Sequence, residues 1–380
     1  MSMNDLIAVS RRYGADLDYV VAGGGNTSWK TSGELYIKGS GTSLDTITEA
    51  GFVKMDRKKL AAIWTSSYPE DQERRESAVL EDMMAARCAG EEKKRPSVET
   101  LLHDLLPFAF VVHTHPALVN GITCSAQGSE AAHDLFGVDC LWIPSTNPGY
   151  VLCKSVKDAW RDHASKTGRQ PAFILLQNHG IFVAAESVAG IDATYGRVMD
   201  AINARVTRRA DFSPLGLDAV SGAASSSKIQ KAGALLAVLA GSGGLAVVHH
   251  AVDKELARLT ASQEAFSVLA KPFSPDHIVY AGSDFLFAEG PGPELEKDYA
   301  DFVTRHGRAP KLAAVRVLGV FGIGANEKSA RLAVDLFRDA AKIAAYVEAF
   351  GGPRYMTPDQ IDFINNWEVE RYRSKISTGA

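Results

Sequence analysis

The sequence predicts an α/β protein, because short apolar runs alternate along the chain with longer stretches of mixed polarity. The runs at 108–112 and 173–176 have the length and composition of buried strands. Stretches such as 187–208 are long enough for amphipathic helices. With 380 residues, 46% of them hydrophobic, the chain can bury the cores of two domains.

Composition excludes several classes of partner. A net charge of -4 and a pI of about 6.2 provide no broad basic surface, so we expect no nucleic acid partner. No apolar run approaches the roughly 20 residues of a membrane span, and the first 14 residues contain no hydrophobic signal segment. The cysteines are few and lack C-x-x-C spacing, which favours reduced thiols. We therefore expect a cytoplasmic protein without a membrane partner.

The N-terminal region is predicted to form a helix over 4–14, capped by Asn4, followed by two glycine-rich loops. These loops lie within 20–30 and 35–43, and the second follows a short apolar run. Glycine backbone N–H groups and short hydroxyls suit a phosphate or another oxyanion. Neither loop has Walker or G-x-G-x-x-G spacing, and each alone is equally explained as a tight turn. Joined as a hairpin, the two loops could face one anion from two sides.

A helix over 73–89 is predicted next, and another beginning with Ser97 as its N-cap and ending before Pro107. Glu99 would then lie in the first turn, with His103 on the same helix face. Near a metal, Glu99 is placed to move protons. The alternative is a first-turn glutamate that only complements the helix dipole.

Three histidines at predicted strand ends indicate a metal site. His113 and His115 end the 108–112 run and, being two apart on a strand, point to one face. His179 follows the run at 173–176. Three neutral imidazoles with an open fourth position are typical of a catalytic divalent metal, zinc first. The alternative is that backbone carbonyls satisfy these side chains, and a cupin is disfavoured because no glutamate lies in 118–122.

Further elements are predicted from the same patterns, namely a strand at 140–144, a loop at 145–150, and helices at 155–167 and 187–208. A shift to Ser, Ala, Gly and Pro then divides the chain into a metal-dependent domain at 1–212, a linker at 213–227 and a C-terminal α/β extension at 228–380.

The extension is expected to contain a helix at 229–240, strands at 245–250 and 315–324, and helices at 326–350 and 367–372, the last at a subunit contact. His249 and His250 are adjacent and cannot chelate one ion from a single strand. Gly322 and Gly324 resemble half of a dinucleotide fingerprint, but Glu327 would repel a pyrophosphate. We therefore predict that these glycines serve packing.

Several of these segments together resemble the class II aldolase/adducin family over residues 5–210. The motifs are Gly25-Asn26-Thr27-Ser28, Lys38-Gly39-Ser40-Gly41, Ser97-Val98-Glu99 with His103, His113-Thr114-His115 and Asn178-His179-Gly180. Through 274–277 and 310–374 the chain more narrowly resembles the aldolase portion of the bifunctional rhamnulose-phosphate aldolase/lactaldehyde dehydrogenases. We expect the dehydrogenase half of those enzymes to be absent.

This resemblance implies a three-layer α/β/α fold with a largely antiparallel central sheet, assembled as a homotetramer with active sites at subunit interfaces. It implies zinc held by His113, His115 and His179, and Glu99 as the acid/base. The implied phosphate contacts are Asn26, Ser40, Gly41 and Ser97, with Thr27, Lys38, His103 and Tyr150 as further candidates. Val98 stands where related aldolases carry a second serine, which removes one hydroxyl from the implied phosphate site.

The expected activity is retro-aldol cleavage of a ketose 1-phosphate of the rhamnulose or fuculose type, giving dihydroxyacetone phosphate and an aldehyde. An epimerase or dehydratase using the same metal chemistry is the nearest alternative. A non-catalytic, adducin-like interaction module is a third, disfavoured because a scaffold needs no open metal site.

Overall fold

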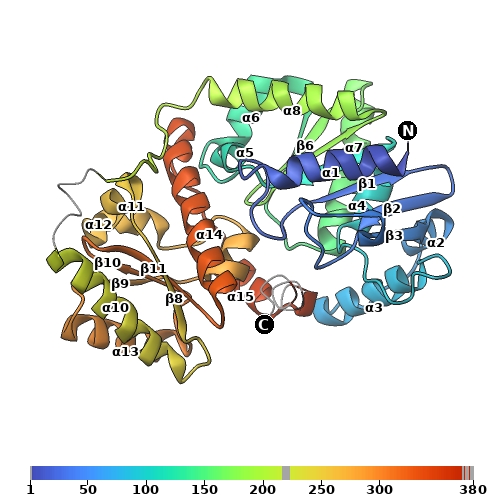
Figure 1. Ribbon diagram of the computed structural model, residues 1–380. Coiled ribbons are helices and arrows are strands. Elements are labelled where there is room, and N and C mark those ends of the chain that lie inside the picture. Colours follow the sequence, from blue (N-terminus) through green and yellow to red (C-terminus); the bar gives the residue numbers. More distant parts are fainter. Residues whose placement is uncertain (1, 216–222, 370–371, 373–375, 377–380) are drawn as a thin grey trace. The chain divides into compact units, whose positions relative to one another are not determined.

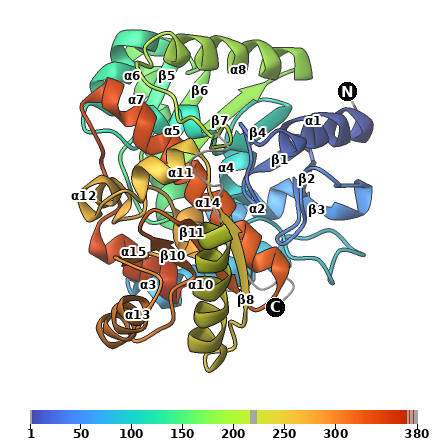
Figure 2. The same ribbon diagram turned by 60° about the vertical axis from the view of Figure 1, so that its left-hand side comes forward.

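The computed structural model describes residues 2–215, 223–369, 372 and 376. The chain divides into two compact units, each with its own sheet. Unit 1 is Met1–Thr123 with Gln127–Arg205, and unit 2 is Cys124–Ala126 with Val206–Ala380. Figures 1 and 2 show the elements of each. The predicted linker at 213–227 lies partly outside the described residues, so the predicted domain boundaries stay a prediction.

Unit 1 is built on a seven-stranded sheet of order β3-β2-β1-β4-β7-β6-β5. Its strands are β1 (Asn26–Lys30), β2 (Glu34–Lys38), β3 (Phe52–Asp56), β4 (Phe110–Thr114), β5 (Cys140–Ile143), β6 (Phe173–Leu176) and β7 (Gly180–Ala185). The β5–β6 pair is parallel and the other five pairs are antiparallel. The expected largely antiparallel sheet is therefore confirmed.

Helices cover both faces of this sheet. They are α1 (Met3–Ala15), α2 (Arg57–Ile63), α3 (Gln72–Ala85), α4 (Thr100–Leu105), α5 (Ala117–Thr123), α6 (Gly128–Phe136), α7 (Tyr150–Thr167) and α8 (Val188–Asn203). Helices α1 and α8 meet on one face, where the rings of Tyr13 and Tyr195 lie 4.8 Å apart. Helices α2, α3, α4 and α7 bury the other face in the main core. The three-layer prediction is confirmed (Figure 1).

Unit 2 is a smaller α/β structure on a four-stranded sheet of order β8-β11-β10-β9. Its elements are α10 (Ala223–Gly241), β8 (Val247–Ala251), α11 (Lys254–Leu259), α12 (Gln263–Phe266), β9 (Leu286–Ala288), α13 (Pro293–His306), β10 (Leu312–Val315), β11 (Gly319–Gly324), α14 (Glu327–Tyr346) and α15 (Pro358–Asn366). Helices α10 and α13 share a core with one sheet face. In the part of either unit that the structure describes, no helix is both long and apolar enough to cross a membrane.

Gly322 and Gly324 pack β11 against α14, as predicted. A Cβ on Gly322 would collide with the carbonyl oxygen of Ala330, and one on Gly324 would collide with Ser329. Because both obstacles belong to α14, the missing side chains are what let this helix approach the strand closely.

Two predicted helix caps are wrong. Helix α1 is capped by Ser2 instead of Asn4, in a capping box with Asp5. The helix expected from Ser97 begins at Thr100, and Glu99 occupies its N-cap position. Ser97 instead closes the preceding turn, since its carbonyl accepts from the Thr100 N–H at 3.1 Å and its hydroxyl from the Glu99 N–H at 3.3 Å.

Several predicted boundaries also differ from the structure. Helix α7 begins at Tyr150, five residues before the expected start, and α10 begins at 223 instead of 229. The apolar run at 315–324 is a hairpin turn and β11, because Val317 adopts a φ of 57° that ends β10. The tail helix expected at 367–372 lies partly outside the described residues, and α15 ends at Asn366.

Candidate metal centre

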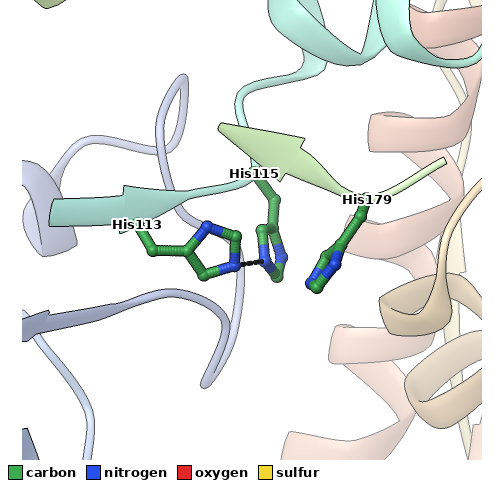
Figure 3. A group of neighbouring side chains, drawn as sticks. All are labelled: His113, His115 and His179. Carbon is green, nitrogen blue, oxygen red and sulfur yellow. Dashed lines mark hydrogen bonds between the residues drawn. The ribbon is translucent and has the colours of Figure 1, made fainter. Parts of the chain in front are cut away.

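The three histidines converge at one edge of the unit 1 sheet (Figure 3). His113 lies in β4, His115 follows that strand, and His179 immediately precedes β7. Since β4 runs antiparallel to both β1 and β7, its end meets the starts of those two strands. One nitrogen from each ring lies within 4.8 Å of the others. The predicted grouping of three imidazoles is present.

Local structure fixes how His113 presents its ring. Its Nδ1 lies 2.9 Å from the carbonyl oxygen of Ile181, and a carbonyl can only accept. The neutral ring therefore carries its proton on Nδ1 and keeps a lone pair on Nε2. The ring stacks on Phe182 at 4.0 Å, and Nε2 faces His115 Nε2 at 2.8 Å. This arrangement directs a metal-ligating nitrogen into the cluster.

Glu99 lies beside the histidines. Its Oε2 is 3.4 Å from His113 Nε2, and its Oε1 is 3.7 Å from His179 Nε2. The residue is 6% exposed, and within the described residues Oε1 is buried without a hydrogen-bond partner. A buried carboxylate oxygen without a donor costs free energy that a nearby cation would offset. The donor set of three imidazoles and this carboxylate fits a divalent metal.

A directed chain of hydrogen bonds leads to Glu99. Asn26 Nδ2 donates to Glu99 Oε2 at 2.6 Å, and Asn26 Oδ1 accepts from His103 Nε2. His103 Nδ1 then accepts from the Ser28 hydroxyl at 2.7 Å. Burial, followed by the nearby His113 and Lys30, holds the pKa of His103 well below its usual value, so this ring is neutral as the chain requires. Asn26 and His103 thus fix the orientation of the carboxylate.

Lys30 is buried beneath this network. Its ammonium donates to the carbonyl of His103. Burial lowers the pKa of Lys30 to about 7, with Arg57 lowering it further and Asp104 opposing. The lysine therefore titrates near neutral pH under the helix that carries His103.

The two predicted glycine-rich loops lie at one end of the β1–β2 hairpin, as expected. Lys38 Nζ lies 3.4 Å from the carbonyl of Gly23, which ties one loop to the other. The Ser40 N–H donates to the Arg95 carbonyl at 2.8 Å, and Gly39 bridges to Pro96. This pairing brings the Ser40–Gly41 turn next to the segment of Ser97.

Ser97 itself reaches the cluster, because its hydroxyl accepts from Asn26 Nδ2 at 3.2 Å. Both amide hydrogens of Asn26 are therefore engaged, by Ser97 and Glu99. The phosphate roles implied for Asn26, Ser40, Gly41 and Ser97 stay predictions.

The structure does not bring Thr27 and Tyr150 to the histidines. Thr27 lies between Asn26 and Ser28, whose side chains face the Glu99–His103 network, so it points to the opposite face and bonds Ser10 at 2.6 Å. Tyr150 packs its ring against Tyr68 at 5.2 Å and Trp64 at 6.1 Å. Thr27 lies in strand β1 and Tyr150 begins helix α7, whereas both residues were expected in loops.

The family described as the Class II Aldolase and Adducin N-terminal domain matches residues 4–193, which is half of the chain. The chain belongs to the class II aldolase/adducin family. The match contains the three clustered histidines, Glu99 and both glycine-rich loops, and it ends within α8. Unit 2 lies almost entirely beyond this family segment.

Individual relatives are similar over about half of the chain. The Bacillus subtilis protein described as the uncharacterized oxidoreductase YuxG is 29% identical over 196 residues, covering 49% of this chain and 27% of that protein. The N-terminal class II aldolase domain of a Thermoplasma acidophilum protein is 28% identical, with a TM-score of 0.44, covering 53% of this chain and 91% of that one. An L-fuculose-1-phosphate aldolase of Thermus thermophilus is 19% identical, with a TM-score of 0.33, covering 52% and 92%. The chain thus spans about a quarter of the length of the curated relative.

Two residues at this family site had no predicted role. Ser28 is the first donor in the hydrogen-bond chain, and Lys30 supports His103 from below. The strand period of two could have identified both, because Asn26, Ser28 and Lys30 alternate onto one face of β1. Their partner His103 is far away in the sequence, and that contact has no local signal.

Proposed function

We propose that this protein is a metal-dependent aldolase that cleaves a ketose 1-phosphate of the rhamnulose or fuculose type into dihydroxyacetone phosphate and an aldehyde. The observation that carries the proposal is Glu99, which lies within 4 Å of two of the three clustered imidazoles and has a buried oxygen for which the described residues provide no donor. His113, His115 and His179 would hold the ion, zinc in the first instance. A bound divalent ion would supply a Lewis acid that polarises the substrate carbonyl.

Glu99 is the proton-transferring group in this proposal. When the bond between C3 and C4 breaks, the electron pair stays at C3, and the C4 hydroxyl gives its proton to water as the aldehyde forms. Protonated Glu99 delivers a proton to C3 in the cleavage direction and removes it in the reverse, condensation direction. Its carboxylate is oriented by Asn26, which is oriented in turn by His103. A fixed carboxylate beside the reacting carbon needs little rearrangement during the reaction.

The phosphate of the substrate is proposed to bind at the glycine-rich loops. Lys38 supplies a positive charge near their backbones, and Ser40 supplies a hydroxyl. Gly41 has a φ of 83°, a conformation that glycine adopts without strain. Asn26 and Ser97 are the other proposed phosphate contacts, whereas Val98, next to Ser97, adds no hydroxyl.

The deciding experiment measures dihydroxyacetone phosphate release from L-rhamnulose 1-phosphate and L-fuculose 1-phosphate, using zinc-loaded and chelator-stripped protein in parallel. We expect release with at least one sugar, loss of release on stripping, and recovery on adding zinc. Zinc-loaded protein that epimerises or dehydrates these sugars without releasing dihydroxyacetone phosphate would replace the aldolase with the nearest alternative. Protein that neither binds zinc nor converts either sugar would favour an interaction module.

From the same family resemblance we propose a homo-oligomer, with a tetramer as the expected state. Light scattering coupled to size exclusion measures this directly. A single species of about 41 kDa, the mass of one chain, would contradict the proposed assembly.

A further inference from the structure

Half of unit 1 and most of unit 2 have the same order of elements. In unit 1, the order is α4, β4, α5, α6, β5, α7, β6, β7 and α8. In unit 2, it is α10, β8, α11, α12, β9, α13, β10, β11 and α14. The corresponding strands lie in the same spatial order, β4-β7-β6-β5 and β8-β11-β10-β9. In both, the last two strands of that order are parallel and the other pairs antiparallel.

The strand registers are also the same. Across β4 and β7, His113 pairs with Phe182, and the two rings are 4.0 Å apart. Across β8 and β11, His250 pairs with Phe321, and these rings are 4.7 Å apart. A slip of one residue in either hairpin would have destroyed this correspondence. His250 therefore occupies the position of His113.

Backbone conformations coincide at a fixed spacing. Gly168 ends α7 with a φ of 68°, and Gly307 ends α13 with a φ of 66°. In the following hairpin turns, Asn178 has a φ of 58° and Val317 a φ of 57°. Both pairs are 139 positions apart. Asparagine tolerates this conformation, whereas a β-branched valine does not adopt it readily.

Identical residues occur at the same spacing of 139. Besides the two glycine caps, they are Arg169 and Arg308, Pro171 and Pro310, Gly180 and Gly319, and Phe182 and Phe321. The N-caps Ser187 and Asn326 also fall at this spacing, and each accepts from the backbone N–H three residues later. The correspondence thus extends from one helix C-terminus to the next helix N-terminus.

A pair of close contacts identifies the position of His115 in unit 2. A Cβ on Gly180 would lie 2.5 Å from the last carbonyl oxygen of β4 and 2.8 Å from the His115 ring. A Cβ on Gly319 would lie 2.5 Å from the last carbonyl oxygen of β8 and 2.9 Å from the Cβ of Val252. Val252 therefore stands where unit 1 has His115.

A close contact between the last strand and the following helix occurs in both units, but the glycine is on opposite partners. In unit 1, Gly190 on the helix would bring a Cβ to 2.9 Å from Ala185 on the strand. In unit 2, the glycine is Gly324 on the strand, and the facing helix residue is Ser329. Both pairs obey the spacing of 139. One glycine is enough to let the helix approach the strand closely. It lies on the helix in unit 1 and on the strand in unit 2.

We propose that unit 2 contains a second copy of the half of unit 1 that carries the metal cluster, with a vestigial metal site at His250, Val252 and Leu318. Leu318 corresponds to His179, because each immediately precedes the glycine that begins the second hairpin strand. The copy has kept one imidazole and replaced two by aliphatic side chains. The natural chain accordingly binds its ion in unit 1 and none at the vestigial site.

The retained histidine still has a lone pair for a ligand, but on the other ring nitrogen than His113. His250 Nε2 lies 2.7 Å from the Leu318 carbonyl oxygen, so this nitrogen carries the proton and Nδ1 keeps the lone pair. Burial, as the largest cause, lowers the pKa of His250; the hydrogen bond to Leu318 opposes this and His249 lowers it further, so the net shift favours the neutral form that binds metal. Two restored histidines would complete a set of three neutral imidazoles.

The test restores the site in the full-length chain by V252H/L318H, after removing the unit 1 ligands with H113A/H115A/H179A. The probe is Co²⁺ alone, followed by the absorption of tetrahedral cobalt and by metal analysis after gel filtration. We expect about one bound equivalent in the restored chain and less than about a tenth in the background chain. Adding H250A to the restored chain should abolish binding. Folded, restored protein that binds no cobalt, or that still binds it with H250A, overturns the proposal.

Leu318 is 6% exposed, so histidine at this position could impair folding. A second variant, V252C/L318C in the same background, avoids this because cysteine is small and tolerates burial. With His250 it provides two thiolates and one imidazole, and cobalt should produce a strong thiolate charge-transfer band. Reduced, folded protein without that band overturns the inference. The outcome is independent of the aldolase proposal, because the background chain lacks the unit 1 ligands.

Discussion

Half of the unit 1 sheet, β4-β7-β6-β5, and the unit 2 sheet, β8-β11-β10-β9, have the same register and turns. They differ in the side chains at the edge where the first strand ends. In unit 1 that edge holds His113, His115 and His179 with Glu99 beside them. In unit 2 only one of the three corresponding positions, His250, is a histidine, and Leu318 is buried in the apolar core there.

The difference shows which residues the architecture needs and which serve chemistry. The glycine that begins the second hairpin strand and the phenylalanine two positions later recur in both sheets, the glycine where a Cβ would collide with the first strand and the phenylalanine where its ring packs on a histidine. Two of the histidines do not recur, although the backbone around them does. The fold therefore tolerates their loss, and function resides in side chains added to it.

The largest expected effect is on metal binding, and it compares the corresponding residues His113 and His250. H113A should lose the bound metal, weakening affinity by more than about 100-fold, because a direct ligand contributes more than the outer partners of a metal site. H250A, the matched control, should retain it. Metal analysis after dialysis against a weak chelator measures both. Equal metal content in the two variants would contradict the proposal that the ion binds in unit 1 and not at His250.

The carboxylates beside the two sheets provide the next comparison. E99Q should retain metal and lose about 100- to 10,000-fold in the rate of dihydroxyacetone phosphate release, the usual contribution of a general acid or base. E327Q is the control, because Glu327 also contacts a histidine, His249, at 3.0 Å, but on the exposed edge of unit 2. Initial rates at saturating zinc distinguish them. A normal rate for E99Q would remove it from the mechanism.

Lys311 in unit 2 stands at the position of Ala172 in unit 1, and its burial should make stability depend on pH. Burial lowers its pKa from 10.5 to about 8, while Nζ bonds the Val279 carbonyl at 2.7 Å. Between these values the unfolded chain holds the proton that the folded chain has lost, so stability rises with pH. A shift of this size lowers the unfolding free energy by about 3 kcal/mol below pH 8, and this destabilisation disappears above pH 10.5.

K311M lacks the titrating ammonium and serves as the reference for the natural chain. Urea unfolding at pH 7 and pH 10 should show the difference in unfolding free energy, natural chain minus K311M, growing by about 2 kcal/mol in favour of the natural chain. Parallel pH profiles for the two proteins would show that the lysine keeps its proton when buried.

The smallest expected effect concerns the shared hairpin turn. Val317 is 74% exposed and holds the left-handed conformation that Asn178 holds in unit 1. V317N should stabilise the protein by about 1 kcal/mol, because asparagine adopts this conformation with less strain. V238N is the control, since Val238 is 76% exposed in helix α10. Thermal unfolding measures both, and equal changes would show that the turn stores no strain.

Sequence patterns alone predicted the three histidines, because apolar runs that end in histidine mark strand ends without knowledge of the fold. Glu99 was predicted from its place near a helix N-terminus and from the family motifs. Sequence patterns also predicted the α/β class and, through the family motifs, the three layers. The internal copy was visible as well, in Gly-Arg-x-Pro at 168–171 and again at 307–310, but these few identities carry little weight without matching registers.

Tertiary structure alone decided how the site is assembled. The sequence determined strand ends and ligand types, since these depend on residues close in the chain. It could not show that Asn26 connects His103 to Glu99, or that Thr27 faces Ser10, because those contacts join residues 17 to 77 positions apart. Nor could it show that the 315–324 run turns at Val317. A positive φ in a valine is imposed by the surrounding sheet against local preference, and only the folded chain reveals it.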